Sequence, residues 1–284
     1  MGNQEIEELM ITTFLGYKYR KQHDLLYSPD GRVPISLINM YYSGKVGRLD
    51  INKVNKGFVD RYIRNESAME NVHELDEIKG LEVMYEDMTN MSPEEFEMFS
   101  LVTLHRDLYS KCPHPEAGGK FRTGDVFLPG TGTDLVDYSY IFDKMLQYED
   151  VFNDLKFLAV YMRESNDYSC IFDFINRCVK LNCELIKLHP FNDGNGRTIR
   201  CFTNKLFEVA GIPPVYIRVD EKTEYHNALN KANNENDYND INSFYLYKIC
   251  DSIIELDINK RVRDEREKNI YDIKRKTKKK HKKK

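Results

Sequence analysis

Two amphipathic helices joined by a short loop constrain the fold of this chain more than any other feature. The first helix is predicted from Cys170 to Leu188, where apolar residues recur in steps of three and four, at Ile171, Phe174, Ile175, Cys178, Leu181, Leu185 and Leu188. Such steps place side chains on one helical face. The second helix carries Ile199, Phe202, Leu206 and Val209, and is predicted to stop at Gly211, which precedes Pro213 and Pro214.

Much of the remaining chain also has helical patterns, so we expect a mainly α fold. A helix over residues 92–111 is predicted because Ser92 can cap it, Pro93 suits its first position and Glu95 completes a capping box. Shorter helical patterns cover residues 74–89, 135–148, 151–163, 222–234 and 241–256.

Only one segment has the pattern of a β-hairpin. Residues 120–128 place β-favouring side chains on both sides of Gly124 and Asp125, and glycine and proline bound the segment. The expected architecture is therefore a helical bundle with one small β-hairpin flap.

Composition excludes several classes of protein. The chain has 284 residues, 31% of them charged, with a mean hydropathy of −0.61, and it lacks the run of about 18 apolar residues that a membrane span needs. The first residues do not resemble a secretory signal. The six cysteines form no C-x-x-C pair, so we expect reduced core thiols and a cytoplasmic protein.

Basic charge is concentrated at the C-terminus. Residues 274–284, KRKTKKKHKKK, hold nine of the 42 Lys and Arg residues and no acid, so the rest of the chain carries an excess of acid. Such a run is typical of a disordered, solvated tail. The alternative is contact with nucleic acid or anionic lipid, which would be unspecific and would weaken with salt.

The loop between the two strongest helices, His189 to Arg200, has the residues of a phosphate site. Gly194 and Gly196 allow the backbone to approach an anion closely, just where the next helix begins and its dipole is positive. Arg197 and Arg200 are three residues apart on one helical face, where both can hold phosphate oxygens.

Two further residues of this loop suit chemistry on a phosphate. Asp193 is its only carboxylate and can ligate a divalent cation that bridges phosphates. His189 stands at the loop entrance, and its imidazole can take a proton near neutral pH. The residues alone therefore indicate a phosphate site with a base and a metal ligand.

This loop resembles the signature of the Fic family, H-x-F-x-[DE]-G-N-G-R-x-x-R, and matches it at every specified position. The resemblance extends over about residues 61–256. The flap begins with the family's G-x-[FY]-R pattern at Gly119, Phe121 and Arg122, and the run from Tyr225 to Leu229 follows in family order.

The resemblance implies a protein adenylyltransferase that moves AMP from ATP, with Mg2+, onto a Tyr, Thr or Ser hydroxyl of a target protein or of itself. His189 would be the general base, Asp193 the Mg2+ ligand, and Arg200 the partner of the γ-phosphate. Phe191 would anchor the loop in the core. The anion hole would comprise Gly194, Asn195, Gly196 and Arg197.

Two other groups of residues have alternative interpretations. Tyr225, His226 and Asn233 are candidates for the adenine and ribose pocket, but they can equally serve packing and the surface. The flap would dock an extended target segment by adding a strand to it, or it is a structural hairpin only. Its candidate docking residues are Phe121, Arg122, Thr123 and Val126.

Residues 65–71, NESAMEN, resemble the family's inhibitory helix, [ST]-x-x-x-E-[GN], although Glu66 stands where the pattern has Ser or Thr. The resemblance implies that Glu70 pairs with Arg200 and so removes the cation that should receive the γ-phosphate. A bidentate carboxylate can compete with a triphosphate for an arginine. The alternative is that Glu70 is an ordinary solvated residue.

The predicted organisation has four parts: an N-terminal extension of unknown role at 1–60, an inhibitory helix at 61–73, a catalytic core at 74–256, and a helical then lysine-rich tail at 257–284. Two other functions stay open. One is the reverse reaction, removal of AMP from a modified protein; the other is a nucleotide-responsive binding module that uses the tail. Homo-oligomers are also compatible with the sequence.

Overall fold

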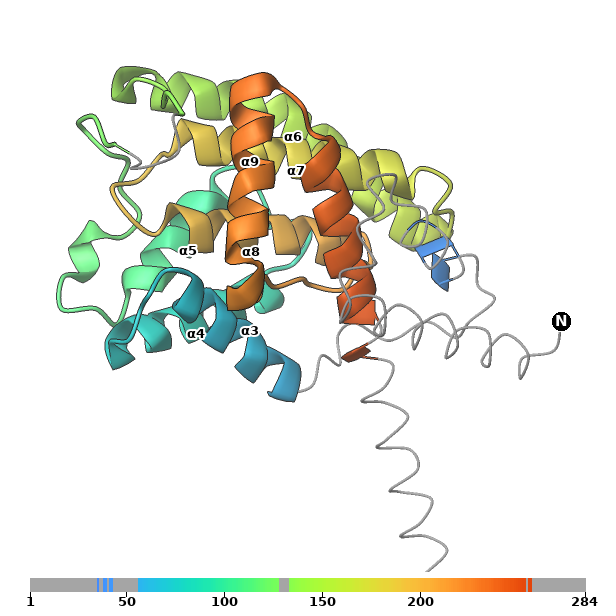
Figure 1. Ribbon diagram of the computed structural model, residues 1–284, viewed down its shortest axis with the longest axis horizontal. Helices are drawn as coiled ribbons and strands as arrows, with labels where there is room; N and C mark the ends of the chain where they lie inside the picture. Colours follow the sequence, from blue (N-terminus) through green and yellow to red (C-terminus); the bar gives the residue numbers. More distant parts are fainter. Residues whose placement is uncertain are drawn as a thin grey trace, which may run out of the picture.

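The computed structural model describes residues 35, 38, 39, 41, 42, 56–127, 133–253, 255 and 256, and shows a helical assembly (Figure 1). Its α-helices are α3 (Lys56–Met69), α4 (Leu75–Asn90), α5 (Ser100–Tyr109), α6 (Ile141–Ser165), α7 (Ile171–Leu188), α8 (Asn195–Val209) and α9 (Lys222–Glu235), followed by a helix over residues 239–253. Short 3-10 turns are η2 (Pro115–Ala117), η3 (Tyr138–Tyr140) and η4 (Val219–Glu221). The mainly α prediction is confirmed.

Several predictions concern residues outside the described part of the chain. The residues concerned are the tail at 257–284 and all but a few positions of the N-terminal extension. Among the described helices, none combines the length and apolarity required to cross a bilayer. All six cysteines are free, as predicted; Cys112 and Cys170 are partly exposed and the other four are buried.

Helix α8 is the centre of the fold and packs against α4, α5, α6 and α7. Every residue of α8 is buried except Gly196 and Glu208, although its apolar spacing alone predicts only one buried face. The polar side chains therefore need partners in the core. Asn204 exchanges two hydrogen bonds with the backbone of Val215, at 2.8 and 2.9 Å, and Asn182 of α7 donates to Thr203 at 2.9 Å.

The helix predicted over residues 92–111 begins later than expected. Ser92 and Glu95 do form the reciprocal bonds of a capping box, at 3.0 and 3.3 Å, but α5 starts only at Ser100. Phe96, between the cap and α5, is fully buried, with its ring 5.0 Å from that of Phe152 and 4.9 Å from that of Phe202. The chain between the capping box and α5 is irregular, and the ring of Phe96 packs into the core from this segment.

The two helical segments predicted at 135–148 and 151–163 are one helix. Helix α6 runs without a break from Ile141 to Ser165, since neither Gly nor Pro interrupts it at Glu149 and Asp150. It ends at Asn166, which adopts a left-handed conformation with φ 59°. Before Ile141, residues 133–137 have no regular secondary structure and are followed by η3.

The β-hairpin of the flap is not confirmed. Residues 119–127 contain no strand, and Leu128 lies outside the described residues. The backbone N–H of Arg122 donates instead to the carbonyl oxygen of Pro190, at 2.9 Å. The start of the flap is therefore bonded to the loop between α7 and α8.

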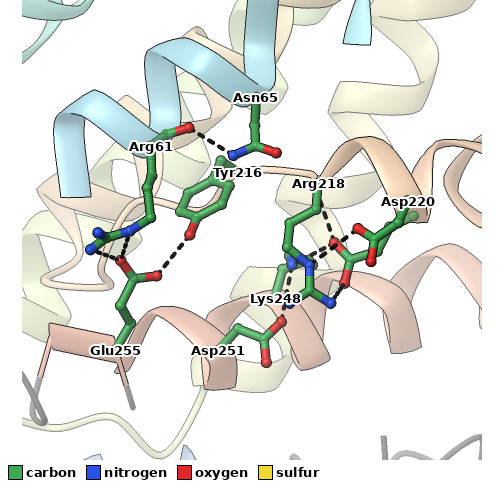
Figure 2. Close-up of polar contacts among 9 residues, drawn as sticks. Arg61, Asn65, Tyr216, Arg218, Asp220, Lys248, Asp251 and Glu255 are labelled. Atoms are coloured by element: carbon green, nitrogen blue, oxygen red, sulfur yellow. Dashed lines mark hydrogen bonds and ion pairs between the residues drawn. The ribbon is translucent and has the colours of Figure 1, made fainter. Parts of the chain in front are cut away.

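Helix α3 is bonded to the C-terminal part of the fold (Figure 2). Arg61 Nε donates to Glu255 Oε1 at 2.6 Å, and the hydroxyl of Tyr216 donates to Glu255 Oε2 at 2.8 Å. At the C-terminal end of α3, Lys222 Nζ donates to the carbonyl oxygen of Met69. A neighbouring cluster joins Lys248 to Glu221, at 2.7 Å, and to Asp251, at 3.0 Å.

The contact between α4 and α5 leads to a first prediction. A Cβ at Gly80 would lie 2.0 Å from the carbonyl oxygen of Leu108, whereas a Cβ at Gly124 would have no heavy atom within 4 Å. Gly80→Ala should therefore force the helices apart and destabilise the protein by about 1–3 kcal/mol. Urea unfolding measures the effect, with Gly124→Ala as the matched control. Equal midpoints for the two variants would refute this packing.

Candidate functional site

The loop between α7 and α8 depends on two left-handed residues. His189 closes α7 with φ 49°, and Gly194 precedes α8 with φ 73°, a conformation that glycine adopts without strain. The side chain of Asn195 then closes the loop, because it accepts from the N–H of Phe191 at 2.9 Å and donates to its carbonyl at 2.8 Å. The unpaired N–H groups of α8 begin directly after this turn, the usual setting for an anion.

His105 of α5 contacts this loop through its ring and Nε2, and the start of the flap through Nδ1. Its ring stacks on Phe191 with centroids 3.7 Å apart. Nδ1 accepts from the N–H of Gly119 at 2.8 Å, so Nε2 carries the hydrogen that it donates to the carbonyl of Asp193 at 2.9 Å. Burial lowers the pKa of His105 to about 4. The neutral imidazole thus joins the start of the flap to the loop.

Arg197 is buried at the start of α8 and faces two carboxylates. Its Nη1 lies 3.1 Å from Glu77 Oε2, and its Nη2 lies 3.7 Å from Asp193 Oδ2. Asp193 is 78% exposed and accepts from the hydroxyl of Tyr109 at 3.0 Å. Asp193 is therefore both accessible to solvent and held in place, as a ligand for a phosphate-bound cation should be.

Arg200, one turn further along α8, is contacted by two carboxylates from the α3 region. Glu66 Oε2 accepts from Nε at 2.9 Å and lies 2.8 Å from Nη2, while Glu70 Oε1 accepts from Nη2 at 3.0 Å. Burial alone would lower the pKa of Arg200, but the two carboxylates raise it well above its ordinary value. The predicted pairing of Glu70 with Arg200 is present in the structure.

Glu70 reaches the start of α8 from the turn that follows α3. The predicted helix at 61–73 is observed at Lys56–Met69, and Asn71, with φ 54°, belongs to the turn. A Cβ at Gly196 would lie 2.6 Å from Glu70 Oε1 and 2.8 Å from Arg200 Nη1. The carboxylate therefore lies against the N-terminus of α8. Although burial opposes it, the field of Arg200 lowers the pKa of Glu70, which keeps it charged.

His189 lies at the end of α7, and its carbonyl accepts from Arg122 Nε at 2.8 Å. Burial lowers the pKa of His189 below its ordinary value, because it disfavours the imidazolium form. The ring is therefore neutral at pH 7 and able to accept a proton.

The flap residues do not all have the roles that the sequence suggests. Arg122 is 2% exposed, and besides His189 its side chain donates to the carbonyls of Gly124 and Val136, so it shapes the loop from within. The ring of Phe121 lies 5.9 Å from that of Phe191. Thr123 is exposed and Val126 is partly exposed, so both are accessible to a partner.

The three α9 candidates lie at different depths. Tyr225 is buried, and its ring centroid lies 6.0 Å from Arg200 Cζ. His226 is exposed, whereas Asn233 is buried and its carbonyl accepts from Lys187 Nζ at 2.8 Å. Tyr225 therefore belongs to the arginine site, and Asn233 lies about 12 Å further along the helix.

Comparison with known proteins identifies this arrangement. Residues 96–207, which include α5 to most of α8, match the Fic/DOC family. This part of the chain is therefore similar to the Fic/DOC family. The Fic signature is the loop described above, with its entrance histidine, its acidic residue and its two arginines.

Curated relatives with a Fic domain are named protein adenylyltransferases. Fic-1 of Caenorhabditis briggsae is 30% identical over 139 residues, 49% of this chain and 24% of the relative. Fic of Nematostella vectensis is 25% identical over 235 residues, 76% of this chain and 49% of the relative. The chain thus spans between a quarter and a half of the length of these relatives.

Solved Fic structures share the fold. A segment of Fic-1 from Caenorhabditis elegans superposes with a TM-score of 0.62 at 19% identity, covering 85% of this chain and 76% of that one. A Fic family protein from Desulfovibrio desulfuricans gives a TM-score of 0.58 at 17% identity, covering 82% and 75%.

Sequence reasoning missed several residues that hold the site together. They come from the helices before the loop and are His105, Tyr109, Glu66 and Glu77. The spacing of His105 and Tyr109, four residues apart on one face of α5, gives a weak signal for two of them. For Glu66, the departure from the family pattern is the only signal.

The burial of His105 predicts a specific loss of stability in acid. Its pKa is about 4 in the folded protein and 6.5 when unfolded, so the unfolded chain binds the extra proton as the pH falls from 6.5 to 4. The free energy of unfolding should decrease by about 2–3 kcal/mol over this range from His105 alone.

Urea unfolding between pH 7 and pH 4.5 tests this, with His105→Gln as the control that cannot titrate. The pH dependence of the wild type should be steeper than that of His105→Gln. Parallel curves would show that His105 is not buried in its neutral form.

Proposed function

We propose that this protein transfers AMP from ATP to a hydroxyl group of a target protein, and that Glu70 restrains the reaction. The observation that carries the proposal is the junction of α7 and α8, where a neutral histidine, the N-terminus of a helix and two arginines lie within twelve residues. Relatives named protein adenylyltransferases support the choice of AMP.

His189 has the properties of the base. Its imidazole is neutral because burial lowers its pKa, and it would take the proton from the target hydroxyl. The hydroxyl oxygen then forms a bond to the α-phosphorus of ATP, the bond between that phosphorus and the bridging oxygen breaks, and pyrophosphate leaves. Arg122, which holds the carbonyl of His189, would keep the base in place.

The start of α8 would bind the phosphates. Its free N–H groups, beginning at Asn195 and Gly196, can bond phosphate oxygens, and Arg197 and Arg200 supply positive charge. Asp193 fits Mg2+, which commonly uses one or two carboxylates together with substrate phosphates. When bound, Mg2+ would neutralise charge on the phosphates. The described residues contain no group of three or more His, Cys, Asp or Glu side chains that could hold a metal ion by themselves.

Glu70 is well placed to restrain this reaction. Its carboxylate bonds Arg200 and lies against Gly196, at the helix N-terminus where an anion binds most favourably. It therefore competes with a phosphate group for the same cation and the same backbone. ATP that binds beside Glu70 would be poorly aligned for attack at its α-phosphorus.

A surface beside the flap supports docking of the target. A pocket of about 420 Å³ is lined by residues 125–127 and 133–137 and by Arg122. Phe127 is 84% exposed, so it offers an apolar contact to a protein partner.

The first test removes Glu70. Glu70→Gly should increase AMP incorporation into protein at least tenfold, which is about 1.4 kcal/mol of barrier. Incubation with Mg2+ and with ATP labelled at either the α- or the γ-phosphate measures it. Label from the α position alone should enter protein. Glu70→Gly/His189→Ala is the blank, and equal rates for the wild type and Glu70→Gly would refute restraint by Glu70.

The same reactions separate the other functions. Label from the γ position alone would indicate a kinase. The partly exposed carboxylate of Glu70 also favours one second candidate, in which it positions water to remove AMP from a modified protein. Release of AMP from a modified target by the wild type, lost in Glu70→Gly, would support that reverse reaction.

The pKa of His189 predicts the pH dependence of the transfer. Because only the neutral ring accepts a proton and its folded pKa lies below 6.5, kcat/KM of Glu70→Gly should fall as the pH drops through that pKa, with its half-maximal value below pH 6.5. The initial rate of AMP transfer, measured from pH 5 to pH 8, tests this. A half-maximal value at pH 7 or above would contradict it.

A further inference from the structure

Arg200 is held by two carboxylates that differ in accessibility. The side chain of Glu66 has no exposed surface and lies within α3, whereas that of Glu70 is 38% exposed and lies in the turn after α3. The inhibitory pattern that residues 65–71 resemble has Ser or Thr at the position of Glu66, so the second acid departs from that pattern. A nucleotide arriving from solvent can displace Glu70 but cannot reach Glu66.

The two acids also bind different sides of the guanidinium. Glu66 Oε2 contacts Nε and Nη2, which form one side of the group, at 2.9 and 2.8 Å. Glu70 Oε1 accepts from Nη2 at 3.0 Å. Nη1 lies beside Gly196 at the start of α8. Within the described residues, the hydrogen bonds from Arg200 to the two carboxylates are donated by Nε and Nη2 and not by Nη1.

Removal of Glu70 would therefore leave an oriented arginine. The end of the guanidinium formed by Nη1 and Nη2 would become available for two parallel bonds to a phosphate, the geometry that arginine favours. The other side would still be bonded to Glu66, whose location inside α3 does not depend on Glu70. Without an acceptor at that position, the long side chain of Arg200 could adopt several rotamers.

We propose that Glu66 is a positioning residue that holds Arg200 by its Nε side, so that its terminal nitrogens face the γ-phosphate of ATP once Glu70 has moved away. The inference rests on the proposed function, in that it assigns Arg200 to the γ-phosphate. What Glu66 supplies is an acceptor oxygen at a fixed place. Burial raises the pKa of Glu66 and Arg200 opposes this shift, but the oxygen accepts the bond in either ionisation state.

Two nearly isosteric variants test the role of that oxygen in the Glu70→Gly protein. Glu66→Gln keeps an oxygen that can accept from Nε, and Glu66→Met fills the same space without one. Titration calorimetry with Mg2+ and either ATP or ADP measures both affinities, and the readout is the ratio of the two dissociation constants. This ratio reports the contribution of the γ-phosphate to binding. A general loss of structure would weaken the binding of ATP and ADP alike and would leave the ratio unchanged.

We expect the parent to bind ATP at least tenfold more tightly than ADP. Glu66→Gln should keep this ratio within threefold, and Glu66→Met should reduce it to less than threefold with little change for ADP. Ser67→Ala is the control within α3, because it removes a bond to the carbonyl of Ile63 without touching Arg200. Its ratio should equal that of the parent.

Other outcomes overturn the inference. They are a full ratio in Glu66→Met, an equal loss for ATP and ADP, the same loss in Glu66→Gln, and a parent that binds ATP and ADP equally. If Glu66→Met does not fold, as judged by its thermal transition, Glu66→Asp replaces it, because the shorter side chain withdraws the oxygen from Nε. A parent with the expected ratios but no AMP transfer would refute the proposed function alone.

Discussion

Two arginines buried at the start of the central helix determine how the N-terminal helices are placed. Arg197 and Arg200 are 3% and 5% exposed, and an unpaired guanidinium at such a depth would cost several kcal/mol. Helix α3 and the turn after it supply Glu66 and Glu70 as the compensating carboxylates for Arg200, and helix α4 supplies Glu77 for Arg197. The charge that would bind a triphosphate in the proposed function is therefore also the charge that the neighbouring helices neutralise.

The parts of this fold that could be predicted from sequence are those fixed by local interactions. Helices α7 and α8 follow from apolar spacing and from a glycine stop, and their observed bounds agree with the prediction to within a few residues. The loop could be interpreted because its residues are consecutive. Glycine backbone, helix dipole and arginine spacing all act within one short segment, so that no knowledge of distant contacts was needed.

The remaining features depend on contacts between distant segments. His105 becomes important only because folding brings Gly119 and Asp193 to its two ring nitrogens. At Ser92 the local signal is present but does not decide the helix start. The capping-box bonds form, yet Phe96 is buried in an irregular segment and the helix begins only after it. Sequence patterns identify side chains that can interact, but packing decides which of them do.

The anchoring of α3 has a consequence for how fast the site can open. Arg61, in the first half of the helix, is bonded to Glu255, and Lys222 is bonded to the carbonyl of Met69 at its C-terminal end. Glu70 is the first residue beyond this second attachment. Its carboxylate can therefore leave Arg200 through rotation of a few backbone bonds while the helix stays docked. Such a rearrangement belongs to the nanosecond-to-microsecond range of loop motion, far faster than the separation of a packed helix.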